Sequence, residues 1–225
     1  MPARIAVIAL LLSSLVPQPS FALSAKAMRA RVDSLILRGY IHGLPYEDAH
    51  RLGTSALPRL AEILADTTLR PHWANATAAV GAIGGPRAFH MLRSFIWDRF
   101  SGPVDQPTYW ALTGAVSVLG FTCGPSDSRV VALLEAHAAP EQWSDVRWSW
   151  GSLTKTRALL TKLAIYDLGY CGTAGAREAL LRLARNPRHH EQAGMIASAL
   201  HLHEEVVKAG GHATYMALSR SRRAR

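Results

Sequence analysis

Histidine is the residue type best placed to do chemistry in this sequence, because five of the ten histidines fall between positions 189 and 212. His201 and Glu205 are four residues apart, a spacing that places both side chains on one face of a helix. Imidazole and carboxylate groups bind zinc, and His212 follows closely enough for the chain to fold it back toward them. These three residues are therefore candidate metal ligands. A polar helix face accounts for them without a metal, and we expect no metal and no other cofactor.

Thiol chemistry is the second candidate, since the chain holds two cysteines, Cys123 and Cys171, each followed by a glycine. In equivalent turns of neighbouring helical units they would lie about 10 Å apart, too far for the ~5.5 Å Cα separation of a disulfide. One extra residue in the turn before Cys123 could bring them together, and the closed loop would then add on the order of 4 kcal/mol. The sequence leaves this disulfide open. Neither cysteine has the His–Asp or His–Asn arrangement of a catalytic nucleophile.

A tryptophan-rich segment, residues 141–151, is the strongest candidate for a binding site. It holds three of the six tryptophans, Trp143, Trp148 and Trp150, with Arg147 between the first two. Exposed tryptophan beside arginine is typical of contacts with a peptide, a glycan or a lipid interface. The alternative is that the rings pack inward and seal a gap in the core. We predict that these four residues bind a partner, with Arg147 and Trp148 as anchors.

The sequence lacks the motifs of several common enzyme classes. The chain has no glycine-rich phosphate loop ending in Lys-Ser/Thr, no Gly-x-Ser-x-Gly elbow and no His-Glu-x-x-His pair. We therefore expect no catalytic activity.

Helices must position all of these residues. Apolar side chains recur at helical spacing, first at Leu57, Leu60, Ile63 and Leu64, and no stretch alternates apolar and polar residues long enough for a strand. Similar stripes lie within residues 76–83, 89–96, 112–119, 130–134, 159–168, 180–184 and 195–200. Glycine and proline fall between the stripes, where helices end and begin. The pattern predicts an all-α fold with helices of about 11 to 17 residues.

The helical stripes also repeat. Three segments align on a glycine near the end of an alanine-rich or apolar helix, at Gly81, Gly120 and Gly169, and a new amphipathic helix follows each. The spacings are 39 and 49 residues, which suit a helical-hairpin repeat with one insertion. A single hairpin cannot bury its apolar face alone, so the units are expected to stack.

Residues 54–96 resemble a HEAT repeat of the kind shared with phycobilin-lyase-like proteins. The matching features are Leu57-Pro58-x-Leu60 in the first helix, and the second helix ending in Gly81-Ala82-Ile83-Gly84 with Pro86 shortly after. Weaker matches extend the resemblance over roughly residues 50 to 205. It implies a short α-solenoid of about four to five stacked hairpins, with a concave face that binds a protein or peptide partner.

Four segments follow from these patterns. Residues 1–22 read as a signal peptide, because Arg4 precedes an apolar run that is too short to span a membrane and Ser20-Phe21-Ala22 resembles a cleavage site. Residues 23–52 are predicted to form N-terminal capping helices and residues 53–207 the HEAT-like repeats. Residues 208–225 are predicted to be a helix end and an arginine-rich tail. The mature chain is then expected to be periplasmic or secreted, without a transmembrane span.

The net charge bears on the chemistry of the partner. It is +9, with a sequence pI near 10.1, so an acidic ligand is compatible with the chain. We expect an exported, non-enzymatic scaffold for a protein or peptide and no nucleic-acid partner. One alternative is a HEAT-like nucleic-acid-binding protein, cytosolic if the first 22 residues are not a signal peptide. The other is a small metal-binding protein centred on His189–His212.

Overall fold

The structure is a computed structural model that describes residues 24–40, 43–124 and 128–223. Within these residues all regular elements are helices, which confirms the predicted all-α fold, and one isolated parallel bridge joins Pro103 to Ser149. The predicted signal peptide, residues 1–22, lies outside the described residues.

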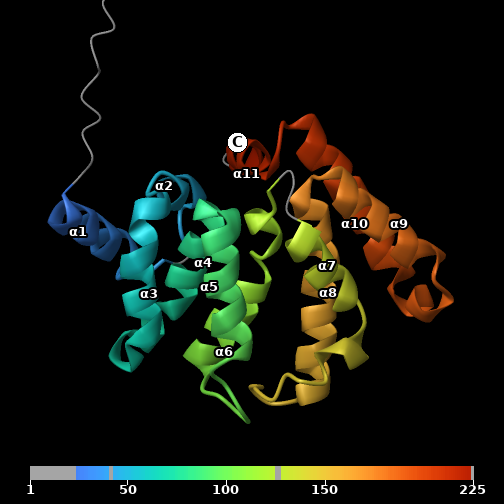
Figure 1. The fold of residues 1–225 in the computed structure, drawn as a ribbon, viewed down its shortest axis with the longest axis horizontal. Helices are drawn as coiled ribbons and strands as arrows, with labels where there is room; N and C mark the ends of the chain where they lie inside the picture. The colour runs from blue at the N-terminus through green and yellow to red at the C-terminus, as the bar shows by residue number, and fades with distance from the viewer. Residues whose placement is uncertain (1–23, 41–42, 125–127, 224–225) are drawn as a thin grey trace, which may run out of the picture.

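Two helices precede the main body of the protein. Helix α1 (Ala25–Ile36) begins at Ser24, whose hydroxyl accepts a hydrogen bond from the backbone N–H of Ala27. The short helix α2 (Tyr46–His50) packs on α4. Both helices fall within the segment predicted to cap the N-terminal end (Figure 1).

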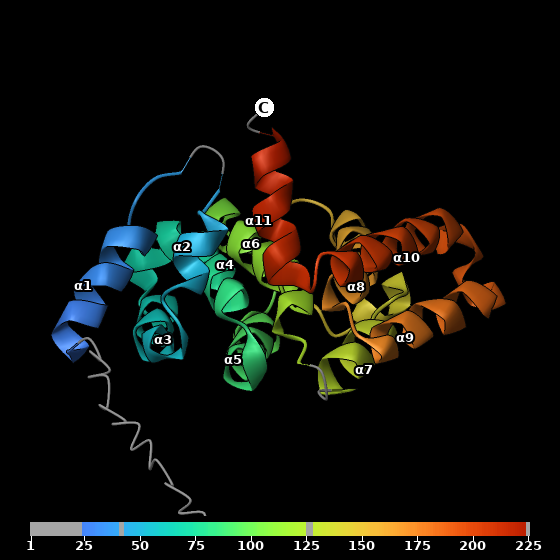
Figure 2. The same ribbon diagram turned by 90° about the horizontal axis from the view of Figure 1, so that it is seen from above.

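The main body consists of two rows of helices (Figure 2). One row contains α3 (Leu57–Ala65), α5 (Gly85–Trp97), α7 (Ser128–Ala136) and α9 (Ala174–Arg185). The other contains α4 (Trp73–Ile83), α6 (Gln106–Val116), α8 (Leu153–Cys171) and α10 (Ala193–Lys208). Short 3-10 helices occur at η1 (Thr54–Ala56), η2 (Thr67–His72), η3 (Gly120–Thr122), η4 (Pro140–Trp143) and η5 (Pro187–Gln192). Each helix of the first row thus precedes its partner in the second row along the chain.

Local sequence signals fix where these helices begin and end. The side chains of Asp105, Ser152 and Thr173 accept backbone N–H hydrogen bonds in the first turns of α6, α8 and α9, which satisfies donors that have no partner within the helix. Helix α8 ends at Gly172, whose φ of 61° is a left-handed conformation that glycine adopts without strain.

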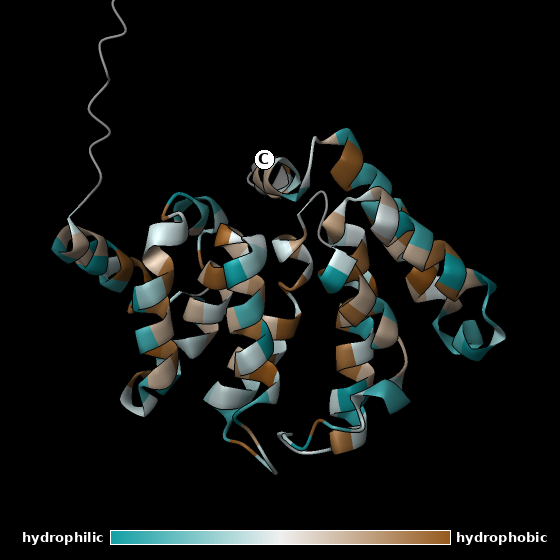
Figure 3. Cartoon of the chain, viewed as in Figure 1, coloured by the Kyte–Doolittle hydropathy of each residue, from teal (hydrophilic) through white to brown (hydrophobic). Residues whose placement is uncertain are grey.

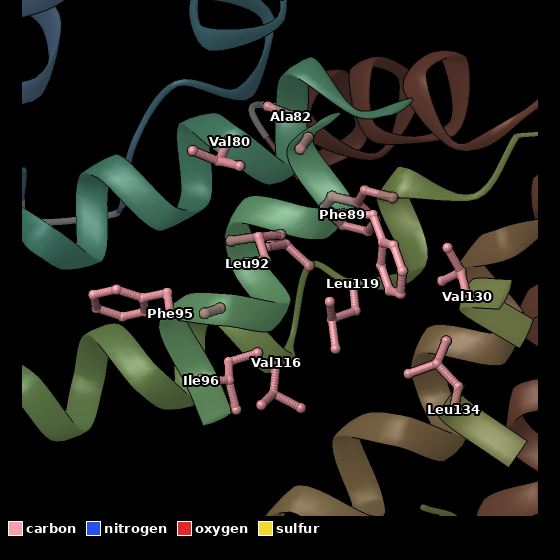
Figure 4. Close-up of a cluster of buried hydrophobic side chains, with 14 of the residues drawn as sticks. Val80, Ala82, Phe89, Leu92, Phe95, Ile96, Val116, Leu119, Val130 and Leu134 are labelled. Carbon is pink, nitrogen blue, oxygen red and sulfur yellow. The ribbon is translucent and has the colours of Figure 1, made fainter. Parts of the chain in front are cut away.

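One hydrophobic core runs through both rows. Figure 4 shows Phe89 and Leu92 of α5 near Leu119, which in turn faces Val130 and Leu134 of α7. Hydrophilic residues cover much of α9 and the turn that follows it (Figure 3). The core is therefore continuous from the N-terminal helices to the C-terminal ones.

The three aligned glycines lie where neighbouring helical units approach most closely. A Cβ atom on Gly81 would collide with the side chain of Val118, and one on Gly120 would collide with the backbone of Asp167. A Cβ atom on Gly169 would lie 2.7 Å from the carbonyl oxygen of Ala199. Val118 and Asp167 each stand two residues before the next aligned glycine. Twice along the chain, therefore, an aligned glycine meets the residue at the equivalent position of the next unit.

We define the central joint as the contact of residues 119–123 with the C-terminal half of α8. The buried Asp167 carboxyl group accepts a hydrogen bond of 2.8 Å at Oδ2 from the backbone N–H of Gly120. The disulfide that the sequence left open is formed at the same joint, with Cα atoms of Cys123 and Cys171 5.2 Å apart. The joint connects the helices α3–α6 to the helices α7–α10.

The C-terminal segment differs from the prediction. Residues 208–225 were expected to be a helix end and a tail, but residues His212–Arg223 form a separate helix, α11. Gly210 and Gly211, with φ of 84° and 113°, turn the chain between α10 and α11. Helix α11 packs against both α10 and α2. The periodicity was missed because arginine and serine dominate the end of this helix.

The close approach at Gly120 predicts a position-specific effect of alanine. Gly120→Ala should lower the free energy of unfolding by about 3 kcal/mol or more, because the new Cβ meets rigid backbone. Gly114→Ala is the matched control, since its Cβ would lie 3.6 Å from Thr77 Oγ1, an ordinary contact within α6. It should leave stability unchanged or raise it by up to about 1 kcal/mol. Urea denaturation of both variants checks this, and equal effects would contradict it.

The burial of Asp167 predicts a pH dependence of stability. Burial raises the pKa of this carboxyl well above its usual range, although hydrogen bonds from the backbone N–H groups of Gly120 and Leu119 lower it. A carboxyl whose pKa is raised on folding stabilises the fold while protonated, and this contribution is lost as pH rises through the folded pKa. Asp167→Asn cannot ionise. Its free energy of unfolding should therefore improve relative to wild type as pH rises above about 4, the usual pKa of the unfolded carboxyl. A pH-independent difference in urea denaturation would refute this.

Candidate functional site

The tryptophan-rich segment runs from the end of α7 back toward α5 and α6. Trp143 is 1% exposed, and its indole N–H donates to the carbonyl of His137 at 2.9 Å. Its ring stacks on Trp97 with centroids 5.8 Å apart, and His137 contacts both rings edge-on. Trp143 is therefore a core residue that holds the end of α7 against α5.

Trp148 is also buried, with 1% of its surface exposed. Its indole N–H donates to the carbonyl of Ile96 in α5 at 3.3 Å, and Tyr109 of α6 contacts its ring. The backbone N–H of Val104 donates to the carbonyl of Ser149 at 3.0 Å, which ties the loop before α6 to this segment. The prediction that Trp148 is an exposed anchor is wrong, because the ring seals the space beside α5 and α6.

Arg147 is exposed, but its guanidinium group is engaged locally. It donates to the carbonyl oxygen of Ser144, which also accepts a hydrogen bond of 3.2 Å from Arg157 of α8. Two arginines thus close the turn before Trp148. Arg147 therefore stabilises the segment while the residue itself remains exposed.

Trp150 and a residue that the sequence analysis missed, Trp110, form the exposed part of this region. Trp150 is 52% exposed, and its ring lies 6.2 Å from that of Tyr109. Trp110, the next residue of α6, is 54% exposed. We call Tyr109, Trp110 and Trp150 the aromatic patch; Trp150 belongs to it by its ring contact with Tyr109, and Trp110 by its place beside Tyr109 in α6. The signal for Trp110 was available, since it falls outside the buried stripe formed by residues 108, 111, 112, 115 and 116.

The start of α6 holds the aromatic patch in place. Asp105 caps the helix through the backbone N–H of Thr108 at 3.0 Å and pairs with Arg70 at 2.8 Å. Hydrogen bonds from Thr108 and then from Arg70 lower the pKa of Asp105, so the carboxylate stays ionised at neutral pH. Trp150 rests on Tyr109, which itself contacts the buried Trp148. The exposed ring of Trp150 therefore stands on a fixed support.

The candidate metal ligands do not come together. Glu205 pairs with Lys208 at 3.4 Å, and the ring of His212 stacks on Phe121 with centroids 5.3 Å apart. Burial, with a smaller contribution from His50, lowers the pKa of His212 to about 4. Among the residues that the structure describes, no group of three or more His, Cys, Asp or Glu side chains could hold a metal ion. The candidate site of His201, Glu205 and His212 is therefore not assembled.

Within the described residues, the fold and the site define an all-helical protein with a two-row body and an aromatic patch in which Trp110 and Trp150 are exposed. No protein-family model, curated protein or solved structure matches the chain. Within the described ranges, no helix has the length and apolar character needed to cross a membrane.

The opposite burial of Trp148 and Trp150 predicts opposite mutational effects. Trp148→Ala should lower the free energy of unfolding by about 3–5 kcal/mol, because it removes a buried ring beside α5. Trp150→Ala should change it by no more than about 0.5 kcal/mol. Urea denaturation monitored by far-UV circular dichroism checks both. A large loss for Trp150→Ala would show that this ring is part of the core.

Proposed function

We propose that the chain is an exported HEAT-like α-solenoid scaffold of about four to five helical hairpins, which binds a protein or peptide partner and has no catalytic activity. The observation that carries this proposal is the aromatic patch, in which Trp110 and Trp150 stay about half exposed and Trp150 rests on Tyr109. Arg147 lies in the same tryptophan-rich segment as Trp150.

The repeated contact between units supports the solenoid. Gly81 meets the unit that contains Gly120, and Gly120 meets the unit that contains Gly169, each through the residue two positions before the next glycine. Helices α4 and α6 pack side by side in one row, as do α8 and α10. Equivalent contacts between successive hairpins are the defining relation of a helical repeat array.

The energetics of interfaces support a role for Trp110 and Trp150. Tryptophan is enriched among the few residues that dominate binding free energy, because a large rigid ring buries much area and loses little conformational freedom. Two of the four large hydrophobic side chains that are exposed in the described part of the chain belong to this patch. Because Tyr109 already supports Trp150, little ordering is needed on binding.

The double substitution Trp110→Ala, Trp150→Ala tests the proposal. Tagged wild type and variant, checked for equal melting temperature, are used to capture partners from an envelope fraction, and the Kd of the captured protein is then measured. We expect the variant to bind at least about tenfold more weakly, since each anchor is worth about 1 kcal/mol or more. N-terminal sequencing of the exported chain tests cleavage after Ala22.

The matched control is Val207→Ala, because Val207 is also an exposed apolar residue, at 51%, on the distant helix α10. It should bind the partner as wild type does. Equal capture by wild type and the double variant would exclude the aromatic patch as the site. A captured glycan or nucleic acid in place of a protein would overturn the proposed class of partner.

A further inference from the structure

The disulfide lies in the wall of an open pocket. A cavity of about 330 Å³ lies between the end of α8, the first residues of α9 and the Gly211–His212 segment, and both Cys123 and Cys171 line it. Structural disulfides are protected when core side chains surround their sulfurs. Here one side of the bond faces a space that a small molecule can enter.

The two cysteine residues differ in exposure. Cys171 is 6% exposed, at the C-terminal end of α8, whereas Cys123 is only partly buried, in the loop after η3. Thiol–disulfide exchange depends on which sulfur the attacking thiolate can reach. Cys123 is therefore the sulfur that an entering thiolate meets more easily.

We propose that the Cys123–Cys171 disulfide is a thiol-exchange site that accepts a small-molecule thiol while the protein remains folded. The thiolate attacks Sγ of Cys123 and forms a mixed disulfide there. The bond between the two cysteines breaks, and its electron pair stays on Sγ of Cys171, which leaves as a thiolate. A second thiolate then attacks the sulfur of the first bound thiol and releases the oxidised disulfide of the small molecule. Cys123 is left as a thiolate, so two thiols are oxidised and one protein disulfide is reduced.

Other contacts at the central joint keep the chain folded during this exchange. The Asp167 carboxyl group still accepts a hydrogen bond from the backbone N–H of Gly120, and the close contact between Gly120 and the Asp167 backbone does not involve sulfur. Phe121 remains packed against Tyr170 and His212. Reduction therefore loosens the joint without removing the interactions that define it.

The experiment treats the full chain with reduced glutathione under native conditions, quenches with N-ethylmaleimide and maps the modified peptides by mass spectrometry. We expect glutathione on Cys123 and maleimide on Cys171 in the early product. The rate constant should stay level as urea is raised below the unfolding transition. A rate that rises with urea in parallel with global unfolding would overturn the proposal, as would glutathione found mainly on Cys171.

A pair of substitutions on α9 tests the route of entry. Ala174 lines the pocket and is exposed, so Ala174→Trp should obstruct the opening and slow exchange by about tenfold. Ala184 is exposed on the same helix but does not line the pocket, and Ala184→Trp should react as wild type does. The role of the pocket would be overturned if both variants slowed exchange equally, or if neither variant slowed it. The peptide map of the wild-type chain tests the exchange itself without any substitution.

Discussion

The close approach of neighbouring helical units at their glycines is the contact on which the rest of the fold depends. At Gly120 the backbone of one unit lies directly on the backbone of Asp167, with no space for even a methyl group. This approach brings the backbone nitrogen of Gly120 to 2.8 Å from the Asp167 carboxyl oxygen Oδ2 and places Cys123 next to Cys171. A side chain at position 120 would separate the units and weaken both contacts.

Helix α8 carries two of the attachments between the halves of the molecule. Its C-terminal end holds the disulfide and Asp167, whereas the segment before its N-terminal end inserts Trp148 against α5 and α6. The helix has 19 residues and is therefore about 28 Å long. Fixing the chain at both ends of one rigid helix restricts rotation between the halves.

The tryptophans show why a binding site is harder to predict than a fold. Trp148 and Trp150 stand in the same short segment, but one ring fills a core space and the other remains exposed. An extended segment directs alternate residues to the same side, so their shared type and spacing suggested a shared role. The two rings differ in burial because each meets a different part of the helices that the segment packs against. Ile96 and Tyr109 surround Trp148, whereas Trp150 contacts Tyr109 from outside.

The sequence by itself determined the all-α class, the positions of the apolar stripes and the glycines at which the units repeat. These features follow from local periodicity and from the backbone freedom of glycine and proline, which act over a few residues. Only the tertiary structure decided that Cys123 and Cys171 are joined, that Trp148 is buried, that His212 stacks on Phe121 and that α11 packs on α2. Each of these outcomes joins residues far apart in the chain. It therefore depends on how the helices pack, which local spacing does not encode.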